Sequence, residues 1–194
     1  QVPSLEVTMD DLRAVTDHAG SDEAIIWTGQ AATGVASLYA ATYPERVAGL
    51  VLLDPRARGT SSPDYPWAPS AAEQRARLER IRKRWGDRGY LEELAQEWAP
   101  EAAGDDAFVE WFVWHLRRSL SPGAALTMAR WEAELDLGAV VAAIRVPTLL
   151  LAHPDRPGPA HWLAERIAGS QVVELPPLRG IYTWADDECH AATM

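Results

Sequence analysis

One strand, turn and helix segment near the N-terminus constrains the fold of this chain more than any other feature. An apolar run, Ala24–Trp27, precedes Gly29, and the alanine-rich stretch Ala31–Thr42 ends just before Pro44. A short apolar run bounded by glycine is typical of a buried strand, and proline cannot continue a helix. The segment therefore predicts a strand, a sharp turn and a helix.

The flanking segments extend this pattern into an alternating order of helices and strands. Apolar residues at helical spacing predict a helix within Ser4–Ala19, and the continuous apolar run Ala48–Leu53 before Asp54 is typical of a strand buried on both faces. This order favours an α/β fold with a mostly parallel sheet and flanking helices. Later elements of the same kind are the strand Val146–His153, a short helix around Trp162–Ile167, the strand Gln171–Leu175 and a helix beginning near Trp184.

A helical insertion interrupts the alternation. Residues 56–67 are rich in Gly, Ser and Pro and predict a loop, whereas apolar spacing across residues 70–135 predicts helices. We therefore divide the chain into a first core part (1–56), a helical cap (57–140) and a second core part (141–194). Four strands are few for a sheet covered on both faces, so we expect the first part of the core to be incomplete.

Composition supports one domain with such an insertion. The chain has 194 residues, of which 47% are apolar, and its nine Trp are numerous for this length. Trp side chains at these positions either fill the core or line an aromatic pocket under the cap. Six of the nine lie in or near the cap: Trp67, Trp85, Trp98, Trp111, Trp114 and Trp131.

Charge and cysteine content exclude several classes of partner. A formal net charge of -10 argues against nucleic acid or an anionic membrane, which a concentrated basic surface would bind. The one basic run, Arg75–Arg88, is interleaved with acids and predicts a solvated helix face. Cys189 is the single cysteine, which excludes an intrachain disulfide and favours a cytoplasmic setting. We predict no membrane-spanning segment, and the chain opens on Gln1, as a processed, excised or incomplete sequence would.

Several stretches, in this order, resemble the α/β-hydrolase superfamily, and in particular the actinobacterial-type hydrolase-like domains that precede class III adenylate or guanylate cyclase domains. The stretches are Asp10–Val15, Ala40–Val47, Pro63–Trp67, Ser121–Ala125, Ala143–Thr148 and Leu163–Ile167. The resemblance implies an α/β-hydrolase fold with a cap, and a cyclase domain in the parent protein.

The resemblance also implies where a catalytic site would lie. The family turn is Gly-x-Ser-x-Gly, and alignment places Thr28 and Ala32 on its two glycines, Gln30 on its nucleophile and Ala31 on the residue whose backbone N–H stabilises the oxyanion. An amide is neutral and barely nucleophilic, so Gln30 provides no attacking atom. We expect this turn to have relaxed, with Gly29 taking the unusual backbone angles.

Of the other two members of the catalytic triad, the acid is retained and the His is replaced. Asp155 corresponds to the acid, whereas Gly180 stands where the family has its His. An acid with no His to orient and no nucleophile beyond it cannot support acyl transfer. We therefore predict that catalysis is lost.

Other residues that could rescue the chemistry are weaker candidates. Thr28 is the best displaced nucleophile, His190 the best displaced base, and Thr33 and Ser37 are expected to pack or bond to helix carbonyls. His153, His161 and Asp155 are too loosely spaced to predict a metal site, so we expect neither a metal nor another cofactor.

Three hypotheses about function remain open. The first is an inactive descendant that senses a ligand, interacts or regulates, with a small apolar ligand under its cap. The second is an active esterase or epoxide hydrolase with relocated or externally supplied catalytic residues. The third is a fragment without separate activity, which the uncovered edge of its sheet would destabilise.

Overall fold

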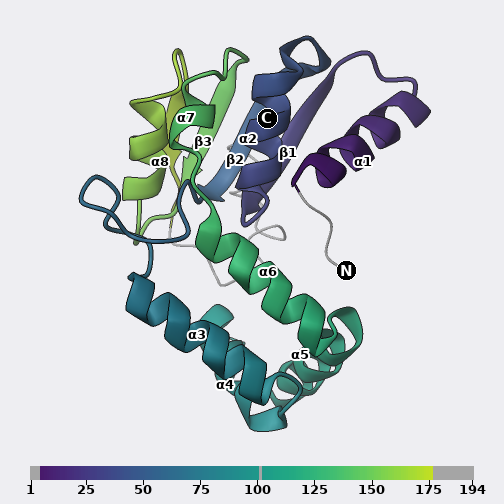
Figure 1. Cartoon of the computed structure of the whole chain (residues 1–194), viewed down its shortest axis with the longest axis vertical. Coiled ribbons are helices and arrows are strands. Elements are labelled where there is room, and N and C mark those ends of the chain that lie inside the picture. Colours follow the sequence, from purple (N-terminus) through teal and green to yellow (C-terminus); the bar gives the residue numbers. More distant parts are fainter. Residues whose placement is uncertain (1–4, 101, 177–194) are drawn as a thin grey trace. The chain divides into compact units, whose positions relative to one another are not determined.

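The computed structural model describes residues 5–100 and 102–176, which divide into two units (Figure 1). The sheet unit comprises residues 5–69 and 132–176, and the helical unit runs from Ser70 to Trp131. Most of the helical pattern predicted for residues 70–135 lies in the second unit. Its role as a cap, and the predicted limits 57–140, stay predictions.

The sheet is parallel, as predicted. Its strands are β1 (Ala24–Gln30), β2 (Val47–Pro55), β3 (Thr148–Ala152) and β4 (Gln171–Glu174), and in the described residues they lie in the order β1-β2-β3-β4. Because neighbouring strands run in one direction, their carboxyl ends meet at the same edge of the sheet, where ligands bind in open α/β folds. Strand β1 lies at one side of this sheet, and its Ile25 side chain is 70% exposed.

Helices of the sheet unit are α1 (Leu5–His18), α2 (Thr33–Thr42), α7 (Gly138–Val141) and α8 (Gly158–Ala164), with a 3₁₀ turn, η1 (Pro44–Arg46). Helix α2 packs on β1 and β2, whereas α8 packs on β2, β3 and β4. Small buried residues of α2, among them Gly34, Ala36 and Ala40, let that helix approach closely. Sequence periodicity did not predict η1 or α7, because three or four residues are too few to show a period.

The segment after β2, predicted as a loop, has an ordered interior. Arg58 is its centre: its Nη1 donates to Ser62 Oγ at 2.5 Å and to Asp64 Oδ1 at 2.6 Å, and its Nε donates to Asp136 Oδ1 at 3.2 Å. Tyr65 is buried, and its hydroxyl accepts the Ala57 N–H at 3.1 Å. Side-chain hydrogen bonds thus order this loop, which has no regular backbone hydrogen bonding to do so.

The helical unit contains α3 (Ala71–Arg84), α4 (Arg88–Trp98), α5 (Asp106–Ser119) and the greater part of α6 (Pro122–Glu134). Side chains that accept backbone N–H groups begin three of these helices, namely Ser70, Asp87 and Asp105, and Ser70 forms a capping box with Glu73. A separate apolar core holds the unit together: Ile81, Tyr90, Leu91, Leu94, Ala95, Phe112, Val113, Leu116, Ala125 and Ala129.

Several Trp side chains of this unit lie at its surface rather than in its core. Trp98, Trp111 and Trp114 expose 37%, 45% and 56% of their surface. The Trp85 indole donates its N–H to the Leu120 carbonyl at 3.0 Å. None of the described helices combines the length and the apolar character that crossing a bilayer requires.

Candidate functional site

Gln30 occupies a strained turn at the carboxyl end of β1. Its φ is 48°, in the left-handed region, which costs a residue with a Cβ about 1–2 kcal/mol. The Ala32 N–H donates to the Gly29 carbonyl at 3.1 Å and closes the turn before α2 begins. Gly29 is not among the described residues with positive φ. The prediction that the turn had relaxed, with Gly29 carrying the unusual angles, is therefore wrong.

Close approach of the neighbouring strand, rather than an unusual backbone angle, requires glycine at position 29. A Cβ at this position would lie 2.5 Å from the carbonyl oxygen of Leu53 on the neighbouring strand. Backbone cannot move aside as a flexible side chain can, so only a residue without a Cβ lets β1 and β2 approach this closely. The close approach ends at the next residue, where the pairing of the two strands shifts in register.

Asp54 stands beside Gln30 at the end of β2. It is only 5% exposed and has a φ of 44°, so a left-handed residue ends β1 and another stands one residue before the end of β2. Gln30 Nε2 donates to Asp54 Oδ2 at 3.3 Å. The amide of Gln30 is thus held by a carboxylate that analysis of the sequence did not select. The signal was present, because an Asp follows the buried run Ala48–Leu53 directly.

Arg156, from the loop after β3, binds the same carboxylate with two hydrogen bonds. Its Nε donates to Asp54 Oδ1 at 2.9 Å and its Nη2 donates to Oδ2 at 2.5 Å. This pairing raises the pKa of the Arg156 guanidinium. Bidentate guanidinium–carboxylate pairs are among the stronger hydrogen-bonded contacts in proteins. Three neighbouring strand ends thus contribute one polar cluster: Gln30, Asp54 and Arg156.

His153 borders this cluster directly after β3. Its side chain is 18% exposed, and its Nδ1 accepts the Asp155 backbone N–H at 3.1 Å. Burial lowers the pKa of His153, and the positive charge of Arg156 lowers it further. The negative charges of Asp54 and Asp155 raise this pKa, but they do not outweigh the two lowering effects. The imidazole is therefore neutral at pH 7, with Nδ1 as an acceptor.

We expect stability to fall as this imidazole is protonated. The folded pKa lies below the unfolded value of about 6.5, so the unfolded chain binds more protons between these two values. The contribution of His153 is fully present above about pH 6.5 and is lost as pH falls toward the folded pKa. Urea unfolding at pH 7.5 and 5.5 should show a larger loss for the wild type than for His153→Gln. Equal losses would contradict this assignment.

Asp155 does not take part in the cluster. Its carboxylate is 90% exposed, and its Oδ2 lies 4.0 Å from His153 Nδ1. Ala31 lies in the turn after Gln30 and is exposed. Gly180 and His190 lie outside the described residues. The roles that the family resemblance implies for Gln30, Ala31, Asp155 and Gly180 stay predictions.

Thr33 and His161, two other polar residues considered from the sequence, have partners outside the Gln30 cluster. The Thr33 hydroxyl is buried and accepts the Arg56 N–H at 3.3 Å, which ties the start of α2 to the chain after β2. His161 is exposed, and its Nε2 lies 3.1 Å from Glu174 Oε1. His153 contacts a different residue, Asp155. Among residues 5–100 and 102–176, no three His, Cys, Asp or Glu side chains are arranged to hold a metal ion.

Replacing Gln30 with glycine should stabilise the chain relative to an alanine variant. Both substitutions remove the hydrogen bond to Asp54, but only glycine adopts a φ of 48° without steric cost. We expect Gln30→Gly to exceed Gln30→Ala in free energy of unfolding by about 1 kcal/mol. Urea denaturation of the two variants measures the difference. An alanine variant as stable as the glycine variant would show that the turn relaxes.

Comparison with solved structures identifies the architecture that carries this cluster. An esterase from Exiguobacterium antarcticum superposes with a TM-score of 0.80 at 17% identity, covering 98% of this chain and 72% of the esterase. A bromoperoxidase from Bacillus anthracis superposes with a TM-score of 0.78 at 17% identity, covering 98% of this chain and 73% of its own. The chain has the α/β-hydrolase fold.

Other comparisons agree on the fold and go no further. An enol-lactonase from Burkholderia xenovorans superposes with a TM-score of 0.74 at 18% identity, covering 98% of this chain and 72% of the lactonase. No protein-family model and no curated protein matches the sequence. Active enzymes of this fold carry their nucleophile on a strand, a sharp turn and a helix, and the assignment of that role to β1, Gln30 and α2 stays a prediction.

Proposed function

We propose that this chain is an α/β-hydrolase-like domain that has lost catalysis and acts in ligand sensing, interaction or regulation. One observation carries the proposal. At the turn that the sequence resemblance assigns to the nucleophile, Gln30 directs a neutral amide to Asp54. An amide has no acidic proton for a base to remove, and so it does not start acyl transfer.

Asp54 is also a poor nucleophile in this setting. It is buried, it accepts two hydrogen bonds from Arg156 and it accepts a third from Gln30. Donors that stabilise a carboxylate lower its tendency to attack carbon, because the charge is already compensated. The cluster is therefore suited to holding a ligand rather than to forming a covalent intermediate.

The backbone strain supports binding at this edge. Left-handed φ values at Gln30 and Asp54 persist only where the surroundings impose them, and such strain concentrates at functional sites. Exposed parts of Gln30 and Arg156 offer an amide and a guanidinium to a ligand at the carboxyl edge of the sheet. The proposed ligand is small and mainly apolar, with one polar group for these donors.

A working hydrolase of esterase or epoxide-hydrolase type is the second candidate. The strained turn at Gln30 favours it, because active enzymes of this fold need that geometry. Such an enzyme would use relocated residues, Thr28 as nucleophile or His190 as base, or residues supplied from outside the chain.

The two candidates differ in an activity assay on the parent protein. We expect no turnover of a short-chain p-nitrophenyl ester and no labelling by a fluorophosphonate probe above background. Gln30→Ser combined with Gly180→His should remain nearly inactive if the surroundings of position 30 have changed, whereas robust activity would show that the site is otherwise intact. Turnover that Thr28→Val or His190→Gln abolishes would reject the sensor and establish the hydrolase.

The regulated partner in this proposal is a class III cyclase domain of the parent protein in the cytoplasm. Sequence resemblance alone supports this part. Cyclase activity of the parent protein should change when the hydrolase-like domain is deleted, and an unchanged rate would remove the cyclase from the proposal.

A further inference from the structure

Helix α5 presents an aromatic face to solvent. Its opposite side is buried through Phe112, Val113 and Leu116, and the helix packs on α4 (Figure 1). On the outward side, Trp111 and Trp114 expose 45% and 56% of their surface. Large aromatic side chains supply much of the binding energy at protein interfaces, so two of them exposed on one helix face are typical of a docking surface.

The two Trp side chains belong to one stripe along α5. Ala107, Trp111, Trp114 and Arg118 recur at i, i+4, i+7 and i+11, a spacing that keeps side chains on one face of a helix. Neighbouring groups hold both rings. The Trp111 ring stacks on His115 with the ring centroids 5.1 Å apart, and the Arg118 guanidinium lies 5.2 Å from the centroid of Trp114. Rings that are already held lose little rotamer freedom on binding.

Charge changes sign along the same helix. Exposed acids stand in the first two turns of α5 and exposed bases in its last turn: Asp106, Glu110, Arg117 and Arg118. Glu110 accepts Arg88 Nη2 at 2.5 Å, and the Gly86 carbonyl accepts Arg117 Nη2 at 2.7 Å. In the part of the chain that the structure describes, Asp106 and Arg118 form no ion pair. A helix that is acidic at its start and basic at its end complements an antiparallel copy of itself.

We propose that α5 docks on α5 of a second copy of this chain, antiparallel and about a twofold axis between Trp111 and Trp114. In this arrangement Trp111 of each copy packs on Trp114 of the other. Arg118 then approaches Asp106 of the second copy across the small side chain of Ala107. A twofold contact needs a surface that is complementary to itself. The inference does not depend on the function proposed for Gln30.

The association is expected to be weak. One pair of helix faces is small for a permanent interface, and two copies that each carry a formal net charge of -10 repel at long range. We expect a dissociation constant of about 10–100 µM for the full chain. Sedimentation velocity across this range should show a monomer–dimer equilibrium. A chain that stays monomeric up to about 500 µM would overturn the proposal.

Tryptophan variants locate the interface. Trp111→Ala and Trp114→Ala should each weaken association of the folded chain at least about tenfold, because each removes a ring from both halves of a symmetric contact. Trp67→Ala is the matched control, since Trp67 is 47% exposed but lies in the loop after β2. Equal weakening by Trp67→Ala and Trp114→Ala would overturn the interface.

Charge reversal tests the antiparallel orientation. Arg118→Asp places like charges near each other across the contact and should weaken association about fivefold, and Asp106→Arg should do the same. The two substitutions in one chain restore opposite charges, so the double variant should associate like the wild type. A double variant as weak as either single variant would contradict this orientation.

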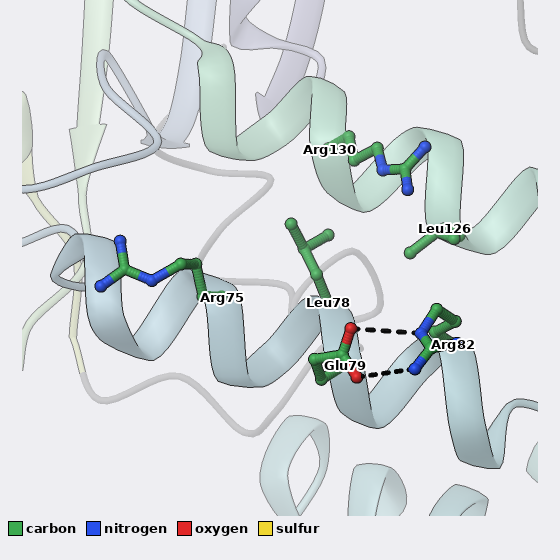
Figure 2. A pocket seen from close by; sticks show the side chains of 6 residues that line it. All are labelled: Arg75, Leu78, Glu79, Arg82, Leu126 and Arg130. Atoms are coloured by element: carbon green, nitrogen blue, oxygen red, sulfur yellow. Dashed lines mark hydrogen bonds and ion pairs between the residues drawn. The ribbon is translucent and has the colours of Figure 1, made fainter.

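Arg130→Asp controls for the change in net charge. Arg130 is exposed on α6, beside a hollow lined by residues of α3 and α6 alone (Figure 2). This variant changes the net charge as Arg118→Asp does, but it should leave association within about twofold of the wild type. Equal weakening by both variants would assign the effect to long-range repulsion and would overturn the pairing of Arg118 with Asp106.

Two other outcomes would give the aromatic face a different occupant. A monomeric chain that sediments with phosphatidylcholine vesicles would assign Trp111 and Trp114 to a lipid surface. Trp114→Ala that lowers the melting temperature equally at low and high protein concentration, with association unchanged, would assign the face to contacts within one chain. Either result would overturn the second copy as the occupant.

Discussion

Replacing Arg156 with alanine is expected to lower the free energy of unfolding by about 3 kcal/mol. Among the described residues, the substitution leaves the Asp54 side chain, which is 7% exposed, with only the Gln30 amide as a side-chain donor. A buried charge without its counter-ion is far less favourable than the same charge in water. Because the Arg156 side chain is itself 46% exposed, water reaches the pair, and we take the low end of the range for buried pairs. Urea denaturation at pH 7.5 measures the loss.

Two further variants test the cause. Asp54→Asn combined with Arg156→Ala removes both charges, so the double variant should be more stable than Arg156→Ala alone. Arg82→Ala breaks an exposed pair with Glu79 and should lower the free energy of unfolding far less than Arg156→Ala does. A double variant as unstable as Arg156→Ala would mean that packing of the Arg156 side chain, rather than the charge of Asp54, causes the loss.

Replacing Gly59 with alanine should destabilise the sheet unit by about 3 kcal/mol. A Cβ at this position would lie 1.7 Å from the carbonyl oxygen of Glu132, where no atom fits. The obstacle is backbone at the end of α6, so either the loop after β2 or α6 must shift. The Gly59 N–H, which donates to the Leu135 carbonyl at 2.9 Å, would lose this bond in either case.

Gly104→Ala is the control for Gly59→Ala. No atom lies within 4 Å of a Cβ built on Gly104, and its φ is not in the positive range. Its thermal unfolding should match that of the wild type within experimental error, whereas Gly59→Ala should unfold several degrees lower. Equal melting temperatures for the two variants would show that the loop after β2 can shift to accommodate a Cβ at position 59 without loss of stability.

Together the two predictions describe what holds the carboxyl edge of the sheet in place. Arg156 ties the loop after β3 to the end of β2, and Gly59 lets the loop after β2 approach the end of α6. Arg58 reinforces the same loop through Ser62, Asp64 and Asp136. The left-handed residues Gln30 and Asp54 are held by the hydrogen bonds that Asp54 accepts from Gln30 and Arg156.

Local patterns in the sequence predicted the elements of the fold well. The apolar runs at Ala24–Trp27 and Ala48–Leu53 became β1 and β2, and the proline at position 44 marks the end of the α2 segment. Strand β1 extends three residues beyond its predicted end, to Gln30, because pairing with β2 continues past the apolar run. Short elements without a period, η1 and α7, escaped prediction.

Position 30 shows the limit of this approach. The amide at the predicted nucleophile position was evident from the sequence, but its backbone angles were not. We expected relaxation, because a left-handed Gln is costly by itself. Pairing with β2 and the hydrogen bond to Asp54 impose the conformation, and both depend on residues more than twenty positions away.

The sequence by itself determined the parallel sheet, the helices between residues 70 and 135 and the amide at position 30, because apolar periodicity and side-chain chemistry are local properties. Only the tertiary structure decided that Asp54 contacts Gln30 and that Arg156 binds this carboxylate. Asp54 and Arg156 are 102 residues apart in the chain. They meet because parallel strands bring their carboxyl ends to one edge, and no local pattern encodes which side chains meet there.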